Sequence, residues 1–249
     1  MKIHALNPLH MKAPRILIAV FFAMCSLAAA QTLSPIVYTS SGTHQLSGQR
    51  NVPGSYVGDI TAEGAMYRVM PSSGTAVLEL SDSQFNSLYR WNTVSYSDMH
   101  GSLLGVYGTR NNATWDVLSD AALVLDNVSV TNNYLFSWSQ SMGIIFFIST
   151  NTLSTIKNST FANNSVVGHT QAWGGVVAAY GADNLSFENN VFRNNSVSAT
   201  YTADNNTAIA QGGAIRIGSN YDYKAQSTAS YVPHYLTISN TLFEGNEAV

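Results

Sequence analysis

The chain has a single cysteine, Cys25, among its 249 residues. Cys25 lies in a segment with the pattern of an export leader, so the rest of the chain has no thiol, no disulfide and no cysteine-based metal site. Charged residues are also scarce, at 10% against roughly 25% in an average globular domain. Low charge combined with many Asn, Ser and Thr residues argues against a helical bundle and is typical of an extracellular β protein.

Basic residues are outnumbered, with 11 Lys and Arg against 14 Asp and Glu and a net charge of −3. Removing residues 1–30 would leave 8 basic residues against the same 14 acidic ones. This balance excludes nucleic acid as a partner, because nucleic-acid binding needs a concentrated basic face. Acidic residues form no Asp-x-Asp motif and no repeated column, and the histidines stand alone, so the sequence predicts neither a metal nor another cofactor.

Residues 1–30 have the pattern of a secretory signal peptide. Lys12 and Arg15 precede the apolar run 16–24, and Ala28-Ala-Ala30 offers a cleavage site before Gln31. The run is shorter than the roughly 20 residues that a membrane span needs. We therefore expect cleavage and export, with an uncleaved anchor as the alternative and either Met1 or Met11 as the start.

The rest of the chain is dominated by a repeat that alternates F-x-x-N motifs with Gly-Gly pairs. The F-x-x-N copies start at Phe161, Phe192 and Phe243, and a degenerate copy starts at Val130, giving spacings of 31, 31 and 51 residues. Two asparagine columns keep the same spacings. The repeated positions are Phe161, Phe192, Phe243, Asn127, Asn158, Asn189, Asn240, Asn133, Asn164, Asn195, Asn246, Gly174, Gly175, Gly212 and Gly213. A fixed motif at such intervals predicts stacked copies of one structural unit.

Within each unit the apolar residues alternate with period two, as in Leu185-Ser-Phe187 and Leu236-Thr-Ile238, which predicts short strands rather than helices. One such unit cannot bury its apolar face alone, whereas stacked units can. We therefore predict a parallel β-helix over residues 55–249, clearest over 122–249, with 31–54 as an N-terminal cap or mobile lead-in. In the weaker upstream part, Leu78 to Phe85 resembles the repeated unit, and Gly64 to Val69 resembles Gly213 to Ile217.

Stacking assigns the repeated residues a structural role. Phenylalanines would form an inward column, and asparagines at turns would form ladders in which each side-chain amide bonds the next. Gly-Gly would mark a turn with positive φ or a place where the backbone passes too close for a Cβ. A polar binding stripe is the alternative for the asparagines.

The motifs Gly-Gly-Val-Val at 174–177, Gly-Gly-Ala-Ile at 212–215 and the three F-x-x-N copies resemble the GGA[ILV] and FxxN repeats of the polymorphic outer-membrane proteins. The resemblance implies a right-handed parallel β-helix that serves as an autotransporter passenger at the cell surface, often adhesive, with a C-terminal barrel in the outer membrane. Nothing in this sequence resembles such a barrel. The sequence is thus expected to be a fragment of a longer protein, or else a product released without its own anchor.

Two polar insertions make up the extra length of the last repeat, at 200–206 and within 219–233. The second insertion places aromatic residues in or beside one loop: Tyr221, Tyr223, Tyr231 and Tyr235. Exposed aromatic side chains are common in binding surfaces and suit stacking on sugar rings. The alternative is that these tyrosines only pack over the side of the coil.

For function we predict an exported, adhesin-like binding or structural protein without catalysis, whose partner is a host-cell surface or a glycan. A purely architectural envelope protein is a second reading. A β-helix polysaccharide lyase or glycoside hydrolase is a third, and it would need clustered carboxylates with Lys or Arg. Lys157 and Glu188 are spaced to pair on neighbouring coils, but such an exposed pair contributes only about 0–1 kcal/mol.

Overall fold

The computed structural model describes residues 32–57, 65–92, 99–110, 117–180, 184–200, 208–218 and 235–249. The chain divides into two compact units, residues 1–30 and residues 31–249, and every described residue belongs to the second. The described residues contain strands and turns and no helix, which confirms the predicted all-β class. Their 29 strands form five sheets, here named A to E.

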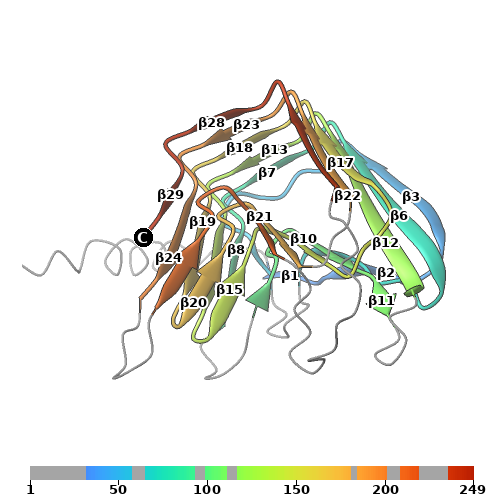
Figure 1. Ribbon diagram of the computed structural model, residues 1–249, viewed down its shortest axis with the longest axis horizontal. Helices are drawn as coiled ribbons and strands as arrows, with labels where there is room; N and C mark the ends of the chain where they lie inside the picture. Colours follow the sequence, from blue (N-terminus) through green and yellow to red (C-terminus); the bar gives the residue numbers. More distant parts are fainter. Residues whose placement is uncertain are drawn as a thin grey trace, which may run out of the picture. The chain divides into compact units, whose positions relative to one another are not determined.

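Sheets C, D and A follow one another along the chain in each repeat (Figure 1). Sheet C contains Gly42–Ser47 (β3), Gly74–Ser81 (β6), Val117–Asp126 (β12), Ser154–Lys157 (β17), Asn184–Glu188 (β22) and Tyr235–Ser239 (β27), with Thr109–Arg110 (β11) paired to β12. Sheet D contains Gln84–Asn86 (β7), Ser129–Thr131 (β13), Thr160–Ala162 (β18), Val191–Arg193 (β23) and Leu242–Glu244 (β28). Sheet A contains Thr32–Leu33 (β1), Tyr56–Val57 (β4), Tyr89–Asn92 (β8), Tyr134–Ser137 (β14), Ser165–Gly168 (β19), Ser196–Ala199 (β24) and Glu247–Ala248 (β29).

Sheets E and B complete each repeat before the chain returns to sheet C. Sheet E contains Met99–His100 (β9), Gln140–Met142 (β15), Gln171–Trp173 (β20) and Ile209–Gln211 (β25). Sheet B contains Ile36–Tyr38 (β2), Tyr67–Val69 (β5), Leu104–Tyr107 (β10), Ile145–Ile148 (β16), Val177–Tyr180 (β21) and Ile215–Gly218 (β26).

Equivalent strands of successive repeats pair in parallel, and among the described strands only β11 and β12 pair antiparallel. The chain thus winds through sheets C, D, A, E and B and then stacks on itself, and one such circuit is called a coil below. Figure 1 shows these coils lying one behind another. The parallel pairing is compatible with the predicted β-helix.

Period-two alternation in the sequence decides which residues enter the core. In β22, Leu185 and Phe187 are buried while Ser186 between them is half-buried on the other face. Equivalent residues pair between coils, so the inward residues form continuous columns. In sheet D, the Phe192 ring stacks on Phe161 with 4.8 Å between centroids and on Phe243 with 5.0 Å.

One charged side chain occupies an inward column. Arg90 of β8 is fully buried, and Leu135 follows it in the sheet A column. Its Nη1 donates to the carbonyl oxygen of His100 at 2.9 Å and also to that of Gly101. These bonds tie sheet A to the start of the turn between sheets E and B, which satisfies part of the hydrogen-bonding capacity of a buried guanidinium.

Residues 32–57 already belong to the stack, because β3 pairs along its whole length with β6 and β1 pairs with β4. The upstream copies also lie in register: Leu80 pairs with Leu125 and Phe85 with Val130. The match predicted between Gly64–Val69 and Gly213–Ile217 holds over its last residues, since Val69 lies in the column of Ile217. Successive pairings place Tyr67 in the column of Ile215, so Arg68 and Arg216 share a column.

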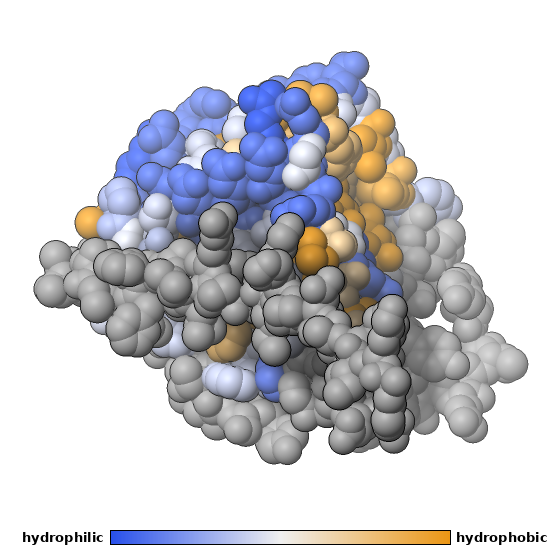
Figure 2. All heavy atoms as spheres, turned by 90° about the vertical axis from the view of Figure 1, so that its left-hand side faces the viewer, coloured by the Kyte–Doolittle hydropathy of each residue, from blue (hydrophilic) through white to orange (hydrophobic). Residues whose placement is uncertain are grey.

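The last coil exposes residues that are buried in earlier coils, since no later coil covers them. Phe243 is 43% exposed, whereas Phe192 in the same column is fully buried. The other large apolar side chains exposed on β27, β28 and the terminus are Tyr235, Leu236, Ile238, Leu242 and Val249. Figure 2 shows hydrophobic residues gathered along the right-hand edge of that view, beside a surface that is largely hydrophilic where it is described.

Candidate functional site

The asparagines that end the F-x-x-N motifs form a buried ladder between sheets D and A. The Nδ2 group of Asn133 donates to Oδ1 of Asn164 at 2.9 Å, Asn164 donates likewise to Asn195 at 2.9 Å, and Asn195 to Asn246 at 2.8 Å. The Oδ1 of Asn164, Asn195 and Asn246 also accepts the backbone N–H of the preceding ladder asparagine. Each Nδ2 also donates to a backbone carbonyl oxygen in the sheet D strand one coil back. The polar groups of these side chains are therefore used within the stack.

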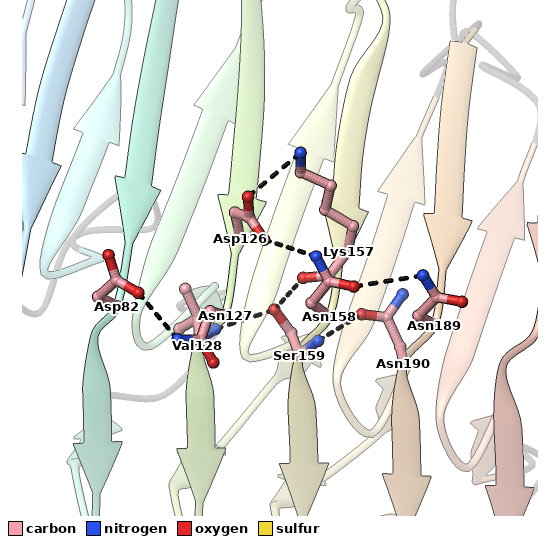
Figure 3. A network of polar contacts seen from close by, with 9 residues as sticks. All are labelled: Asp82, Asp126, Asn127, Val128, Lys157, Asn158, Ser159, Asn189 and Asn190. Carbon is pink, nitrogen blue, oxygen red and sulfur yellow. Dashed lines mark hydrogen bonds and ion pairs between the residues drawn. The ribbon is translucent and has the colours of Figure 1, made fainter.

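The other asparagine column lies exposed at the turn between sheets C and D. Asn127, Asn158, Asn189 and Asn240 have φ between 45° and 56°, the left-handed region that Asn tolerates better than most residues. Asn127 donates to Asp82 and Asn158 to Asp126, each at 2.8 Å (Figure 3). In the earlier coils, therefore, the acceptor for the asparagine side chain is a carboxylate. Among the described residues of this column, a hydrogen bond between two asparagine side chains occurs only from Asn189 to Asn158, at 3.3 Å.

A third polar column, which the sequence analysis missed, lies one residue further on and is buried. Val128 N donates to Ser159 Oγ at 3.1 Å, and Ser159 N donates to Asn190 Oδ1 at 3.0 Å (Figure 3). The signal is present in the sequence as Ser159, Asn190 and Thr241, which keep the spacings of the asparagine columns. Figure 3 shows Ser159 and Asn190 linking one coil to the next.

The Gly-Gly pairs lie at the corner between sheets E and B and serve both of the purposes predicted for them. Gly174 and Gly212 have φ of 66° and 73°. A Cβ on Gly175 would overlap the carbonyl oxygen of Gly213, and a Cβ on Gly213 would overlap the backbone of Glu247. The first glycine turns the chain, and the second admits the neighbouring backbone.

A polar hollow of about 180 Å³ lies at the turn between sheets C and D, lined by Arg50, Asp82, Gln84, Asn127 and Asn158 among others. Its arginine is engaged by the backbone, because Arg50 Nη1 donates to the carbonyl oxygens of Gln49 at 2.7 Å and Asp82 at 2.6 Å. The Asp82 carboxylate accepts from Asn127.

The nearby ion pair differs from the one expected. Lys157 Nζ lies 3.2 Å from Asp126 Oδ2 on the preceding coil, so its partner is Asp126 rather than Glu188. The hydrogen bond from Asn158, together with Lys157, lowers the pKa of Asp126 despite some burial. A carboxylate with a lowered pKa is a weak general base near neutral pH.

Of the four tyrosines predicted for a binding loop, Tyr221, Tyr223 and Tyr231 lie outside the described residues. Tyr235 begins β27 and is 66% exposed. The two insertions attach to a single coil: described residues resume at 208, just before β25, and end at Gly218, the last residue of β26. The first insertion thus joins β24 of sheet A to β25 of sheet E, and the second joins β26 of sheet B to β27 of sheet C.

That outer corner carries a second cluster of side chains, separate from the main core. Tyr107, Met142, Phe146 and Ala178 are buried there, although they lie outside the coil, and Met70, Ile148, Trp173 and Tyr180 pack against them. We call these residues, with His100 and Arg216, the outer cluster. The outer cluster consists of three columns of side chains. One column is on sheet E, one is at the middle of the sheet B strands, and one is at the last residue of those strands.

Side-chain sizes alternate within the outer cluster. Where the middle position is small, at Gly105 and Ala178, both flanking positions are aromatic; where it is large, at Phe146 and Arg216, the flanks are non-aromatic. Consequently the aromatic pair of one coil leans over the large residue of the next. His100 stacks on Phe146 with 4.3 Å between centroids, and Tyr107 lies 6.0 Å from the same ring.

We call such an aromatic pair, together with the large residue that it covers, a clamp. In the second clamp the covered residue is the cation Arg216 instead of Phe146. Trp173 and Tyr180 stack at 5.1 Å and 23°, and the Arg216 guanidinium carbon lies 4.1 Å from the Trp173 centroid and 5.1 Å from that of Tyr180. Arg216 Nε donates to Gln211 Oε1 at 2.9 Å. All three clamp residues are half-buried, so they are still reached by solvent.

Two donors of this clamp have no acceptor. Trp173 Nε1 and Arg216 Nη1 are both buried, and no described residue accepts a hydrogen bond from either. A buried donor left unsatisfied costs about 1–3 kcal/mol, more when charged. The clamp thus offers N–H donors, one positive charge and two flat rings, and would favour a ligand that brings acceptors.

Sequence reasoning missed the outer cluster and assigned His100 no role. The one available signal was the recurrence of Arg before a residue of the inward column, at Arg68 and Arg216. The described residues hold no group of three or more His, Cys, Asp or Glu side chains placed for a metal ion. They also include no helix of sufficient length and apolarity to cross a membrane.

Searches against family models, curated proteins and solved structures found no match for the chain.

Proposed function

We propose that this protein is an exported, right-handed β-helical binding protein without catalysis, of the kind that serves as an adhesive passenger at a cell surface. The leader pattern of residues 1–30 and the resemblance of the GG and F-x-x-N repeats to those of polymorphic outer-membrane proteins support export and the surface location. The parallel stacking of coils is consistent with the fold that this resemblance implies.

The observation that supports the binding role is that repeated and unrepeated residues differ in how their hydrogen-bonding groups are used. The asparagine ladder uses its own donors and acceptors between coils. The Arg216 clamp, in contrast, keeps two N–H donors for which no described residue is an acceptor, and its arginine lies on the coil to which both insertions attach. Recognition therefore belongs to the outer corner and its insertions, and the partner we propose is a host-cell surface or a glycan.

A polysaccharide-degrading enzyme is the second candidate, and the turn between sheets C and D is where it would act. Asp82, Asp126, Lys157 and Arg50 all lie there. Both oxygens of Asp126 are already engaged, by Asn158 and Lys157, and its pKa is lowered. These features favour a structural role for the carboxylate and hence the non-catalytic proposal.

Two assays on the purified protein test the proposal. Incubation with a panel of acidic and neutral polysaccharides should release no new reducing ends and no unsaturated products; release of either would establish the enzyme. Binding to host cells or a glycan array should be saturable and should fall when residues 219–233 are deleted. Unchanged binding after that deletion would show that the insertion does not take part.

A further inference from the structure

We infer that the Arg216 clamp is a binding site for a carboxylate-bearing sugar, a uronic-acid unit of an acidic glycan. The inference rests on the proposed binding function and names the ligand class and the residues that recognise it. Trp173, Tyr180 and Arg216 would make the contacts, and Gln211 would hold Arg216 in position.

The charge and the donors select a carboxylate. Arg216 is fixed by its Nε bond to Gln211 and by the two rings beneath it, so its position is set before any ligand arrives. Its Nη1 and the Trp173 Nε1 are both donors, and no described residue supplies them with an acceptor. An anionic oxygen is the acceptor that binds a guanidinium most strongly, through charge-assisted hydrogen bonds.

The aromatic geometry selects a ring-shaped ligand. Trp173 and Tyr180 stack within 23° of parallel with Arg216 over both rings, and both residues are half-buried, so part of this aromatic pair stays accessible next to the cation. The face of an aromatic ring is electron-rich and attracts the partly positive C–H groups of a pyranose ring. A uronic acid joins the two features, because its carboxylate is attached directly to such a ring.

The equivalent clamp two coils earlier shows what is particular to this one. His100 and Tyr107 enclose Phe146, which fills the middle position with an apolar ring that is 1% exposed. At the Arg216 clamp the same position holds a half-buried cation. Gly218 beside it leaves room, since a Cβ there would lie only 3.0 Å from Arg216 Nη1.

The test is titration calorimetry of the purified protein with a galacturonic-acid hexasaccharide at low ionic strength. The Arg216→Met variant should bind at least tenfold more weakly, because a charge-assisted hydrogen bond is lost. Trp173→Phe, which keeps the ring but removes the donor, should weaken binding about three- to tenfold. Arg193→Met is the matched control: it removes an equal charge from an exposed pair with Glu244 on sheet D and should change affinity less than twofold.

Several results would overturn the inference: no saturable binding of the hexasaccharide, equal losses in Arg216→Met and Arg193→Met, or equally tight binding of a neutral hexasaccharide. Polyglutamate binding as tightly would assign the site to acidic peptides. Circular dichroism and thermal melting of each variant separate lost binding from lost folding, and Trp173→Phe supplies an independent answer if Arg216→Met does not fold. Cell binding without uronate binding would refute this site alone, whereas cleavage of the hexasaccharide would refute the non-catalytic function and leave the site standing.

Discussion

The side-chain amide of Asn133 donates to the side-chain oxygen of Asn164 at 2.9 Å, across two neighbouring coils. The same oxygen accepts the backbone N–H of Asn133 at 3.0 Å. Asn164 in turn donates to Val130 O and to Asn195 Oδ1, each at 2.9 Å. One buried side chain thus joins three successive coils, and its geometry gives the first prediction.

Replacing Asn164 with Leu should lower the free energy of unfolding by about 3–5 kcal/mol, because buried partners on both neighbouring coils lose their hydrogen bonds. Urea denaturation followed by circular dichroism measures the change. The control is Asn189→Gly, at an exposed position with φ of 54° and a long side-chain hydrogen bond to Asn158 at 3.3 Å, which should cost under about 0.5 kcal/mol. Equal losses in the two variants would contradict the assignment of the inner column as the ladder.

The residue before each ladder asparagine is a separate test of backbone conformation. Asn163 is exposed and has φ of 56°, in the left-handed region. Asn163→Val should destabilise the protein by about 1–2 kcal/mol, since a β-branched residue is strained there. Asn163→Gly should be neutral or slightly stabilising, and a thermal melt of both variants distinguishes strain from a lost side-chain contact.

The phenylalanine column should tolerate apolar replacement but not charge. Phe192 is fully buried between Phe161 and Phe243, so Phe192→Asp would place an unpaired carboxylate in the core. We expect a loss above about 4 kcal/mol or failure to fold, and a much smaller loss for Phe192→Leu. A soluble Phe192→Asp protein with an unchanged melting temperature would show that the column does not face inward.

Burial raises the pKa of Tyr134 to about 12, from the ordinary tyrosine value of 10.0. A raised pKa in the folded state means that the unfolded chain releases its proton first as the pH rises. The stability contributed by this tyrosine is therefore complete below about pH 10 and is lost as the pH rises toward 12. Tyr134→Phe should reduce this alkaline loss, measured by urea midpoints across that range.

Tyr235→Phe is the control for Tyr134→Phe, because its ring is 66% exposed and its hydroxyl can be removed with little effect on the core. Tyr235→Phe should leave the alkaline loss of stability unchanged. If both variants unfold at high pH as the parent does, Tyr134 does not contribute to the pH dependence.

Much of the coil could be predicted from the sequence because the same residue types recur at equivalent positions. Phe161, Phe192 and Phe243 occupy one column, and so do the ladder asparagines, so spacing alone reveals the register. Period-two alternation then indicates which face is buried, as at Leu185 and Phe187. Handedness, export and surface location are not observed in the fold and stay predictions.

The candidate site could not be predicted because its residues do not repeat. Phe146, Ala178 and Arg216 share one column, yet their sizes and charges differ. The role of each depends on its neighbours: Arg216 contacts Trp173 and Tyr180, which both come from the preceding coil, and Trp173 also comes from another sheet. Likewise Lys157 lies near two acidic neighbours in the sequence-derived column, Asp126 and Glu188, and only the side-chain geometry selects Asp126.

The central claim is that repeated residues hold the stack while unrepeated residues of the outer corner recognise a ligand. The most direct measurement compares Asn164→Leu and Arg216→Met side by side, recording for each the melting temperature and the affinity for the uronic-acid hexasaccharide below the melting range. We expect Asn164→Leu to melt lower with affinity within about twofold of the parent, and Arg216→Met to melt near the parent with affinity reduced at least tenfold. Affinity lost in Asn164→Leu while it is still folded, or affinity retained in Arg216→Met, would contradict the account.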